Sequence, residues 1–477
     1  MKLIFSRKLW MTSLAILTLS LLSACGALSV QVVTPTTESV TLPAVTSTPE
    51  TPAPTQLAAP TKTPAPTQTA AHTETPASTQ TAAHTETPTV GVTPTTPPVK
   101  SPTSTDAVTI EYIKMKDANT GWAIGKLIGG TRDMVLSTQD GGKTWTNITP
   151  PHAFDAIGPD NKSAIAYFSD TGNAWVFFYN KDMTPLGTTS AVIWSTTDCG
   201  QTWKASHALD LANIQMAYFK PSDISFSDNQ HGWVMVHLDA GMMHDYITIF
   251  ATSDGGQTWK EVVDPTGQSL PQSCYKNGMV FLDANTGWVA GDCGGVMSGV
   301  YFYKTTDGGK TWTNQTLPAP AAAPNAFTNQ ADACGSYPPE FIDAKVGFMS
   351  VKCSNLSAST PTTTTWPYIT SNGGMTWTAL PALSDPVGTL SFLDDKTGWF
   401  LGASSTDASQ ATHALFQTTD GGKTWKQFTK LSWSGQLDFI SAQAGWVVAS
   451  DGNNLALVQT TNGGTTWQEI KPVVVSN

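Results

Sequence analysis

Asp307-Gly308-Gly309-Lys310-Thr311-Trp312 is one of seven copies of the same six-residue stretch in this chain. Every copy begins with aspartate or asparagine and ends with Thr-Trp, and its second glycine never changes. The first residues are Asp140, Asp198, Asp254, Asp307, Asn372, Asp420 and Asn462, and the last are Trp145, Trp203, Trp259, Trp312, Trp377, Trp425 and Trp467. Self-similarity at spacings of 42 to 65 residues indicates a repeat architecture.

Each repeat carries the pattern of four short strands. In the fourth repeat, 279–282 and 288–290 are apolar runs separated by an Asp/Asn/Gly turn, and 300–304 is the next run. The six-residue stretch then turns the chain, and 311–314 begins the fourth strand. Short runs separated by Gly/Asp turns are typical of antiparallel β-structure.

The repeat number and strand pattern predict an all-β protein, a seven-bladed β-propeller of four-stranded antiparallel blades over residues 106–477. A closed ring removes most of the free strand edges that separate small sheets would expose. No long stretch after the N-terminal segment has the 3.6-residue period of a helix, which argues against helical repeats. The seventh repeat contains its own fourth strand, which argues against a swapped closure strand near 108–115.

The N-terminus predicts export and a lipid anchor. Residues 1–24 combine Lys2, Arg7 and Lys8 with an apolar run at 9–22, as a secretory signal peptide does. The sequence Leu22-Ser23-Ala24-Cys25 resembles the bacterial lipobox, which implies cleavage before Cys25 and lipidation of its thiol. The alternative is an ordinary signal peptide with a chance cysteine. We therefore expect an extracytoplasmic lipoprotein anchored to the bacterial cell membrane.

Residues 25–105 predict a disordered, lipid-anchored linker. They are dominated by threonine, proline, alanine and serine and have almost no large apolar side chains. Such a composition cannot bury enough apolar surface to offset the entropy lost on ordering.

The charge of the chain excludes nucleic acid as a partner. Without the three basic residues of the signal peptide, 22 Lys and Arg face 36 Asp and Glu, because 25 − 3 = 22, and the net charge is 22 − 36 = −14. An acidic surface repels phosphate backbones. Arg132 is the single arginine after the signal peptide.

The repeated stretch has the residues of a structural turn. Its aspartate oxygen can accept backbone N–H groups across the turn, and an asparagine oxygen can do the same. Its glycines supply positive φ angles, and its tryptophan can cover apolar surface. We therefore expect a folding device with no catalytic residue in it.

The cysteines predict two disulfides. Cys274 and Cys293 are separated by 19 residues, and so are Cys334 and Cys353. Each couple brackets the first hairpin of a repeat, where antiparallel pairing brings its two members together. Cys199 would then remain unpaired. Metal binding is the alternative, but no His/Cys cluster with ligand spacing accompanies these cysteines, and we predict neither a metal nor a cofactor.

Strand order predicts which face binds. In an up-and-down blade, the repeated tight turns share one face, and the irregular segments share the other face. These segments are 150–162, 180–189, 206–221, 239–246, 264–276, 317–339 and 354–367. Variable loops on a rigid scaffold usually carry binding residues, so we expect a protein or glycan partner on this loop-rich face.

The motif Thr-x-Asp-Gly-Gly-x-Thr-Trp resembles the Asp-box, or BNR repeat. Its pairing with a Gly-Trp strand start, as at Gly287-Trp288, is similar to that of Ycf48/Hcf136-like propellers. Those are photosystem II assembly factors with many relatives in non-photosynthetic bacteria. The resemblance implies a non-enzymatic binding or assembly protein. The acidic charge and the single arginine favour a general exported relative over a photosystem factor.

A glycoside hydrolase is the alternative function. Xyloglucanase-like enzymes also carry Asp-boxes, and they need a pair of carboxylates beside the scissile bond. Candidates on the loop-rich face are Asp182, Asp210, Asp239, Asp245 and Asp292, and their spacing selects no pair. Sialidase chemistry needs an arginine triad, which Arg132 alone cannot provide.

Overall fold

The computed structural model describes residues 105–475, except 188, 213, 295–297, 329–331, 356–361, 384–386, 404–411 and 453. This part of the chain forms thirty strands and contains no helix. It accordingly holds no helix that could cross a membrane. The predicted signal peptide, the lipidation site Cys25 and the linker up to residue 104 lie outside the described residues.

Consecutive strands pair antiparallel into six sheets. Four of them have four strands each, in chain order across the sheet. Two are β5 (Lys162–Phe168), β6 (Ala174–Asn180), β7 (Ile193–Thr196) and β8 (Lys204–Ala205), and β9 (Lys220–Phe226), β10 (Gly232–Gly241), β11 (His244–Thr252) and β12 (Lys260–Val263). The others are β22 (Val387–Phe392), β23 (Gly398–Ala403), β24 (His413–Thr418) and β25 (Lys426–Leu431), and β26 (Ser434–Phe439), β27 (Gly445–Ser450), β28 (Leu455–Thr460) and β29 (Gln468–Ile470).

The fifth sheet has nine strands because a single residue pair, Asp292 with Gly335, joins two groups. The first group is β13 (Tyr275–Phe281), β14 (Gly287–Asp292), β15 (Phe302–Thr305) and β16 (Thr313–Asn314). The second is β17 (Asp332–Ser336), β18 (Glu340–Phe341), β19 (Gly347–Asn355), β20 (Thr362–Thr370) and β21 (Thr378–Ala379). Both β17 and β18 pair with β19, so they are two parts of one interrupted strand.

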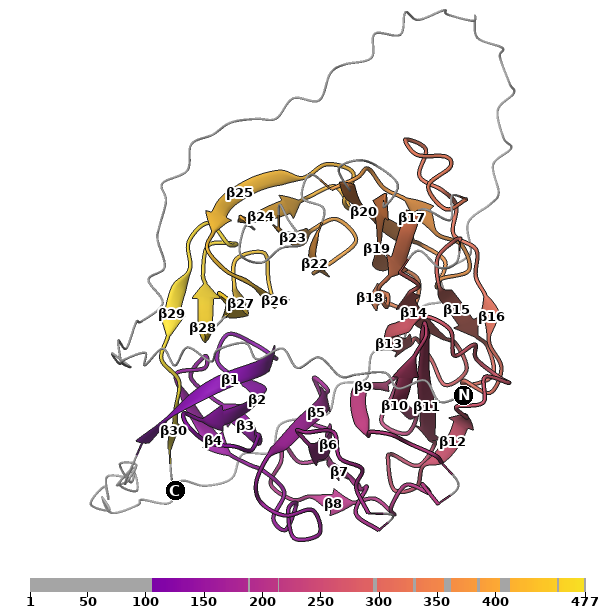
Figure 1. The fold of residues 1–477 in the computed structure, drawn as a ribbon. Coiled ribbons are helices and arrows are strands. Elements are labelled where there is room, and N and C mark those ends of the chain that lie inside the picture. The colour runs from indigo at the N-terminus through magenta and orange to yellow at the C-terminus, as the bar shows by residue number, and fades with distance from the viewer. Residues whose placement is uncertain are drawn as a thin grey trace, which may run out of the picture. The chain divides into compact units, whose positions relative to one another are not determined.

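The sixth sheet contains both ends of the described chain. Its strands are β1 (Thr105–Met115), β2 (Gly121–Leu127), β3 (Met134–Thr138), β4 (Thr144–Asn147) and β30 (Val473–Val475). Figure 1 shows the six sheets arranged in a ring, with β5, β9, β13, β22 and β26 nearest the centre and β8, β12, β16, β25 and β29 at the rim. The architecture is therefore an all-β, propeller-like ring.

Aromatic stacking joins neighbouring sheets. The Trp233 ring on β10 lies parallel to the Phe281 ring on β13, with 3.6 Å between centroids, and Trp399 lies on Phe439 at 3.7 Å. The glycine before each such tryptophan makes room for the phenylalanine of its own sheet, since a Cβ at Gly232 would lie 2.3 Å from the Phe226 ring. The Gly-Trp pair of the sequence is therefore a packing device between sheets.

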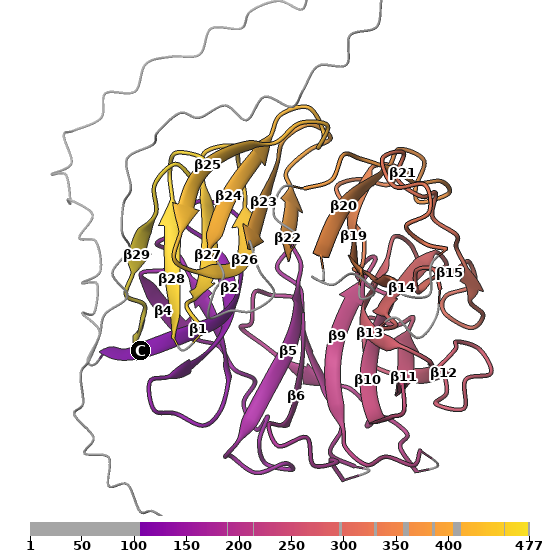
Figure 2. The ribbon, with the colours of Figure 1, turned by 45° about the horizontal axis from the view of Figure 1, so that its top comes forward.

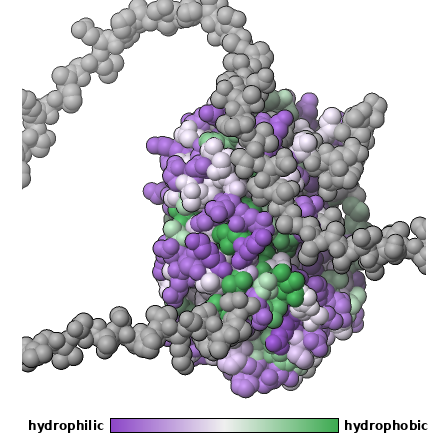
Figure 3. Space-filling model, turned by 90° about the vertical axis from the view of Figure 1, so that its left-hand side faces the viewer, coloured by the Kyte–Doolittle hydropathy of each residue, from purple (hydrophilic) through white to green (hydrophobic). Residues whose placement is uncertain are grey.

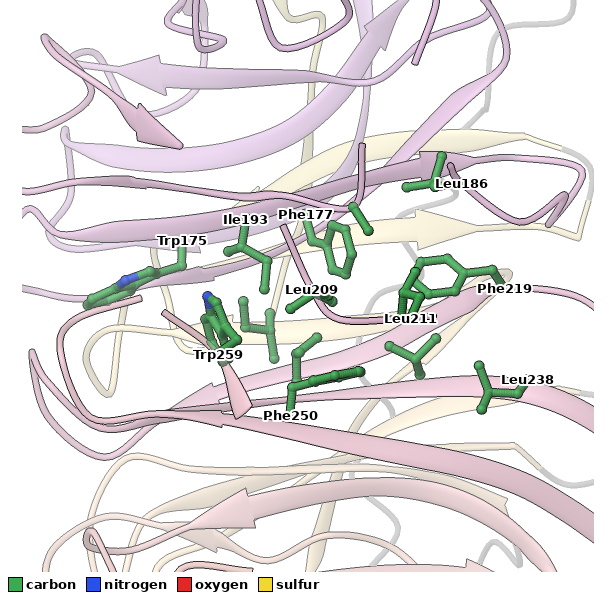
Figure 4. Close-up of a cluster of buried hydrophobic side chains, with 14 of the residues drawn as sticks. Trp175, Phe177, Leu186, Ile193, Leu209, Leu211, Phe219, Leu238, Phe250 and Trp259 are labelled. Atoms are coloured by element: carbon green, nitrogen blue, oxygen red, sulfur yellow. The ribbon is translucent and has the colours of Figure 1, made fainter. Parts of the chain in front are cut away.

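Apolar clusters fill the spaces between the sheets. In the cluster between β5–β8 and β9–β12, Trp175, Phe177, Phe219 and Phe250 are at most 2 % exposed (Figure 4). Burying one such side chain contributes about 1.5–3 kcal/mol. The outer rim beside β29 and β30 is different, because hydrophobic residues form only small patches among hydrophilic ones there (Figure 3).

The ring closes through the C-terminal strand. β30 lies parallel to β4, with Val474 opposite Trp145, and antiparallel to the start of β1, with Val475 opposite Thr105. β1 pairs with β2 along 108–115, and β29 completes its own sheet, so no strand is swapped. Trp446 on β27 also donates its indole N–H to the Gly141 carbonyl at 3.0 Å. β30 was not predicted from the sequence, because three residues are too few to show the alternating pattern of a strand.

Candidate functional site

A buried threonine lies at the centre of every Asp-box turn. Its hydroxyl accepts the N–H of the second box glycine at 2.9–3.1 Å and donates to Oδ1 of the box aspartate or asparagine at 2.7–3.0 Å. The seven are Thr138, Thr196, Thr252, Thr305, Thr370, Thr418 and Thr460. The sequence motif contains this threonine, but its central role was not predicted.

The box aspartate is fully engaged by its own turn. Oδ1 of Asp307 accepts the N–H groups of Lys310 and Thr311, and Oδ2 accepts the Thr311 hydroxyl at 2.6 Å. Partial burial raises the pKa of Asp307, but these hydrogen bonds stabilise the carboxylate more strongly, so the net shift of the pKa is downward. Asn372 accepts through Oδ1 as well, and its amide donates to the Thr376 hydroxyl at 2.8 Å. These bonds fit the predicted structural role.

The box tryptophans close the turns. Five of them donate the indole N–H to the carbonyl of their own second box glycine at 2.8–3.1 Å. These are Trp145, Trp259, Trp312, Trp425 and Trp467. Trp203 instead donates to the Ile148 carbonyl at 2.8 Å.

The box turns and the other loops lie at opposite ends of the strands. We call the end with the β2–β3, β6–β7, β10–β11 and equivalent turns, together with the links between sheets, the loop-rich face. The described residues include nine large, exposed hydrophobic side chains, which are Leu127, Ile128, Met183, Met242, Met243, Tyr275, Tyr337, Met375 and Leu455. Met375 belongs to a box turn, Tyr337 lies in the break between β17 and β18, and the other seven belong to the loop-rich face. Apolar exposure therefore marks the face on which binding was predicted.

Three of the segments predicted to be irregular contain strands: β17 (Asp332–Ser336) lies in 317–339, β20 (Thr362–Thr370) begins in 354–367, and β10 and β11 extend into 239–246. Residues 239–246 were expected to be an irregular loop, but β10 and β11 continue through them and pair up to Gly241 and His244. Only Met242 and Met243 form the turn, with φ angles of 45° and 70°. Figure 2 shows β9, β10 and β11 side by side in this sheet. The hairpin was missed because its turn lacks the Asn-Gly or Asp-Gly signal of such turns.

Both predicted disulfides are present. Cys274 and Cys293 have an S–S distance of 2.01 Å, and Cys334 and Cys353 have one of 2.02 Å. Cys199 is an exposed free thiol. The two bridges flank the pair that joins the halves of the nine-stranded sheet, since Asp292 precedes Cys293 and Gly335 follows Cys334.

A buried polar cluster lies behind this region. Nδ1 of His237 and Oδ1 of Asp245 are 2.7 Å apart, and each residue is 2 % exposed. Oδ2 of Asp245 accepts the backbone N–H of Lys276 at 2.8 Å. The Lys276 ammonium donates to three backbone carbonyls, and burial lowers its pKa to about 8. Asp245 thereby ties the β10–β11 hairpin to β13, and its carboxylate is committed to that role.

The other candidate carboxylates form hydrogen bonds within their own loops. Asp182, Asp239 and Asp292 accept backbone N–H groups of nearby residues. Asp210 accepts the N–H of Ala212. No hydrogen bond or ion pair within 105–475, leaving out the undescribed gaps, joins any two of the five candidates. The structure also brings no three His, Cys, Asp or Glu side chains of that region together as a metal site.

A second polar cluster gathers near the ring axis. Nζ of Lys114 on β1 lies 3.5 Å from Oδ1 of Asp438 on β26. Burial lowers the pKa of Lys114, but the carboxylates of Asp438, Asp170 and Glu340 raise it, and the net shift is upward. Asp438 accepts the Met115 N–H at 2.6 Å, and Asp223 on β9 accepts the Met279 N–H at 2.6 Å. Burial raises the pKa of Asp223 to about 6. No sequence motif indicated this cluster, because its members come from strands far apart in the chain.

One segment of the chain matches a known protein family. Residues 208–330 match the family model described as photosynthesis system II assembly factor YCF48. The chain thus contains Ycf48-like BNR repeats, as the repeated box and the Gly-Trp pairs indicated. No curated protein matches the chain.

Similar solved structures support the fold. Oligogalacturonate lyase from Vibrio parahaemolyticus has a TM-score of 0.50 and 10 % identity, over 77 % of this chain and 93 % of that one. YCF48 from Cyanidioschyzon merolae has a TM-score of 0.39 and 17 % identity, over 76 % of this chain and 97 % of that one. The GH74 xyloglucanase from Xanthomonas campestris has a TM-score of 0.32 and 11 % identity, over 75 % of this chain and 64 % of that one. At 10 % identity, the likeness to the lyase, with its TM-score of 0.50, shows the propeller-like fold alone.

Proposed function

We propose that this protein is an exported, membrane-anchored, non-enzymatic binding or assembly propeller that holds a protein partner on its loop-rich face. The observation that carries the proposal is the distribution of the exposed apolar side chains among the described residues, seven of nine of which belong to that face. Exposed apolar groups on a soluble domain are typical of interaction sites.

The proposal includes a ring of seven blades. In this scheme the nine-stranded sheet counts as two blades, β13–β16 and β17–β21, because one residue pair alone joins them. Each of the seven boxes then turns the chain between the third and fourth strands of one blade. Aromatic ring contacts from β6 to β26 link each of these blades to the next and support this count.

The anchor and the location outside the cytoplasm rest on the N-terminal sequence. The lipobox-like Leu22–Cys25 and the threonine- and proline-rich linker motivate them. Disulfides at two positions fit an oxidising compartment. Mass spectrometry of the purified membrane form should find a diacylglyceryl group on Cys25, and an unmodified thiol there would contradict the anchor.

The match to the YCF48 family motivates a partner that is a protein. One structure in that family is described as YCF48 bound to D1 peptide. For this chain we propose only the class of partner, because its acidic charge and single mature arginine favour a general exported relative over a photosystem factor.

Site-specific photo-crosslinking tests the binding face. A photoreactive amino acid at Ile128 or Met242 should capture a defined protein band in detergent-solubilised membranes. The same amino acid at Met375, which is 67 % exposed in a box turn, is the matched control and should capture none. Equal capture from Met375 would contradict the proposed face.

The glycoside hydrolase remains the second candidate, motivated by Asp239 and Asp292. Both carboxylates belong to the loop-rich face, and neither is in an ion pair with another described residue. A reducing-sugar assay on a polysaccharide panel tests it. Activity that an Asp292→Asn change abolishes would favour the enzyme over the binding protein.

A further inference from the structure

Four exposed methionine and tyrosine side chains lie on neighbouring strands, and we call them the Met–Tyr patch: Met242 and Met243 in the β10–β11 turn, Tyr275 at the start of β13, and Tyr337 in the break between β17 and β18. Their exposed fractions are 95 %, 46 %, 50 % and 38 %. The patch crosses β10–β11, the start of β13 and the segment between β17 and β18.

Hydrogen bonds and strand pairing hold the members together. The Cys274 N–H donates to the Met243 carbonyl at 2.9 Å, which sets the methionine turn beside Tyr275. Tyr275 lies opposite Asp292 in the β13–β14 ladder, and Asp292 lies opposite Gly335, two residues before Tyr337. Both disulfides flank these pairs. The patch therefore lies on strands that the two disulfides cross-link.

The methionine turn is kept at a cost in stability. Both of its residues have positive φ angles, 45° and 70°, which type I′ turns usually give to Asn-Gly. A non-glycine residue is strained in this region of backbone conformation. Neither methionine belongs to a buried apolar cluster of the described residues. Flexible, polarisable methionine side chains suit adaptable protein contacts.

The patch lies in a negative field. The Asp292 carboxylate is directly opposite Tyr275 and has no ion-pair partner among the described residues. Burial raises the pKa of the Tyr275 hydroxyl, and the Asp245 carboxylate behind it raises that pKa further. The neighbouring Lys276 is 1 % exposed and bonded to three carbonyls, so it is not available to a partner. Lys352 on β19 lies opposite Gly335, and Lys220 on β9 lies opposite His237.

One face of the Tyr275 ring stacks on His237, with 5.3 Å between centroids. No other aromatic ring of the described residues stacks on Tyr275, which is 50 % exposed. A lysine or arginine held over a tyrosine ring beside a carboxylate gains both a cation–π contact and an ion pair.

We propose that the Met–Tyr patch binds a polypeptide segment in which a lysine or arginine is flanked by apolar side chains. The cation lies between Tyr275 and Asp292, and the apolar side chains contact the two methionines and Tyr337. This inference rests on the proposed function and specifies its partner by chemistry.

Titration calorimetry with synthetic peptides tests the inference. The probes are a twelve-residue peptide of alternating leucine and lysine with glycine spacers, and its counterparts with glutamate or glutamine in place of lysine. The lysine peptide should bind about tenfold more tightly than the glutamine peptide, the effect of one ion pair and one cation–π contact. Equal affinities for all three peptides would overturn the proposal.

Variants separate the patch from the fold. Asp292→Asn keeps an acceptor for the Gly294 N–H and should weaken lysine-peptide binding about fivefold to tenfold, whereas Asp182→Asn, at another loop-rich carboxylate, should not. The double change Met242→Asn and Met243→Gly should raise the melting temperature and still weaken binding. A variant that is more stable and binds equally well would refute a role for the methionines.

The crosslinking experiment distinguishes failure of the proposed function from failure of the basic-segment inference. If crosslinking from Ile128 and Met242 still captures the membrane partner after Asp292→Asn and Tyr275→Ser, the proposed function stands and the basic-segment inference falls. If no loop-rich position captures a protein, the proposed function falls as well.

Discussion

Replacing Thr305 with valine should damage its box more than replacing the box aspartate itself. The Thr305 side chain is 1 % exposed, and its hydroxyl accepts the Gly309 N–H at 2.9 Å and donates to Asp307 Oδ1 at 2.8 Å. Valine has the same shape but no hydroxyl, so the buried Gly309 N–H loses its acceptor. Asp307→Asn instead copies what the chain already has at Asn372, whose amide bonds the Thr376 hydroxyl at 2.8 Å.

The magnitudes follow from these bonds. Leaving a buried N–H group unpaired costs about 1–3 kcal/mol, so Thr305→Val should lower the free energy of unfolding by about 2 kcal/mol. Asp307→Asn keeps the acceptor oxygen and should cost less than about 1 kcal/mol.

Urea denaturation followed by tryptophan fluorescence measures both values, with an unchanged m-value as the check that the unfolding reaction is the same. The equivalent change Thr460→Val serves as a second copy of the experiment in a distant box. If both valine variants are destabilised no more than Asp307→Asn, the central role of the threonine is wrong.

Three further predictions concern the ring as a whole. Replacing Cys334 and Cys353 with serine should lower the free energy of unfolding by about 3 kcal/mol, since the bridge closes a short loop in the unfolded chain; urea midpoints of the oxidised parent and the variant measure this. Deleting 473–477 should remove β30 and lower the melting temperature, and a deletion that leaves it unchanged would show that β30 does not hold the ring closed. Asp223 has a folded pKa of about 6, above its unfolded value of about 3.9, so the folded protein binds the extra proton and loses stability as pH rises from about 4 to 6. Asp223→Asn cannot titrate and should flatten that part of the stability–pH curve, by on the order of 1–2 kcal/mol, in thermal melts between pH 4 and 7.5.

The all-β repeat fold could be predicted from the sequence because the turn in each box is formed by residues close together in the chain. Its turn depends on residues within a few positions of one another, as in the bonds from Asp307 to Thr311. The disulfides were predictable for a similar reason, since each couple brackets one hairpin and antiparallel pairing sets its separation.

The features that were missed depend on distant parts of the chain. The axial contact between Lys114 and Asp438 joins residues 324 positions apart. His237 becomes significant only when β11 places Asp245 beside it. The turn at Met242 and Met243 was missed because its residues contradict the usual turn chemistry. Local rules fail there, at the place where we propose contact with a partner.

Because β30 pairs with β1, the two ends of the described chain meet in one sheet and the ring is closed. Val475 is opposite Thr105 in an antiparallel ladder, so the two ends of the described chain are neighbours. A short turn inserted between them would convert the two strands into an ordinary hairpin. New termini could then be opened in an exposed turn outside the boxes. Circular permutants of this protein should therefore fold, and they would allow the termini to be moved around the ring while the loop-rich face is kept intact.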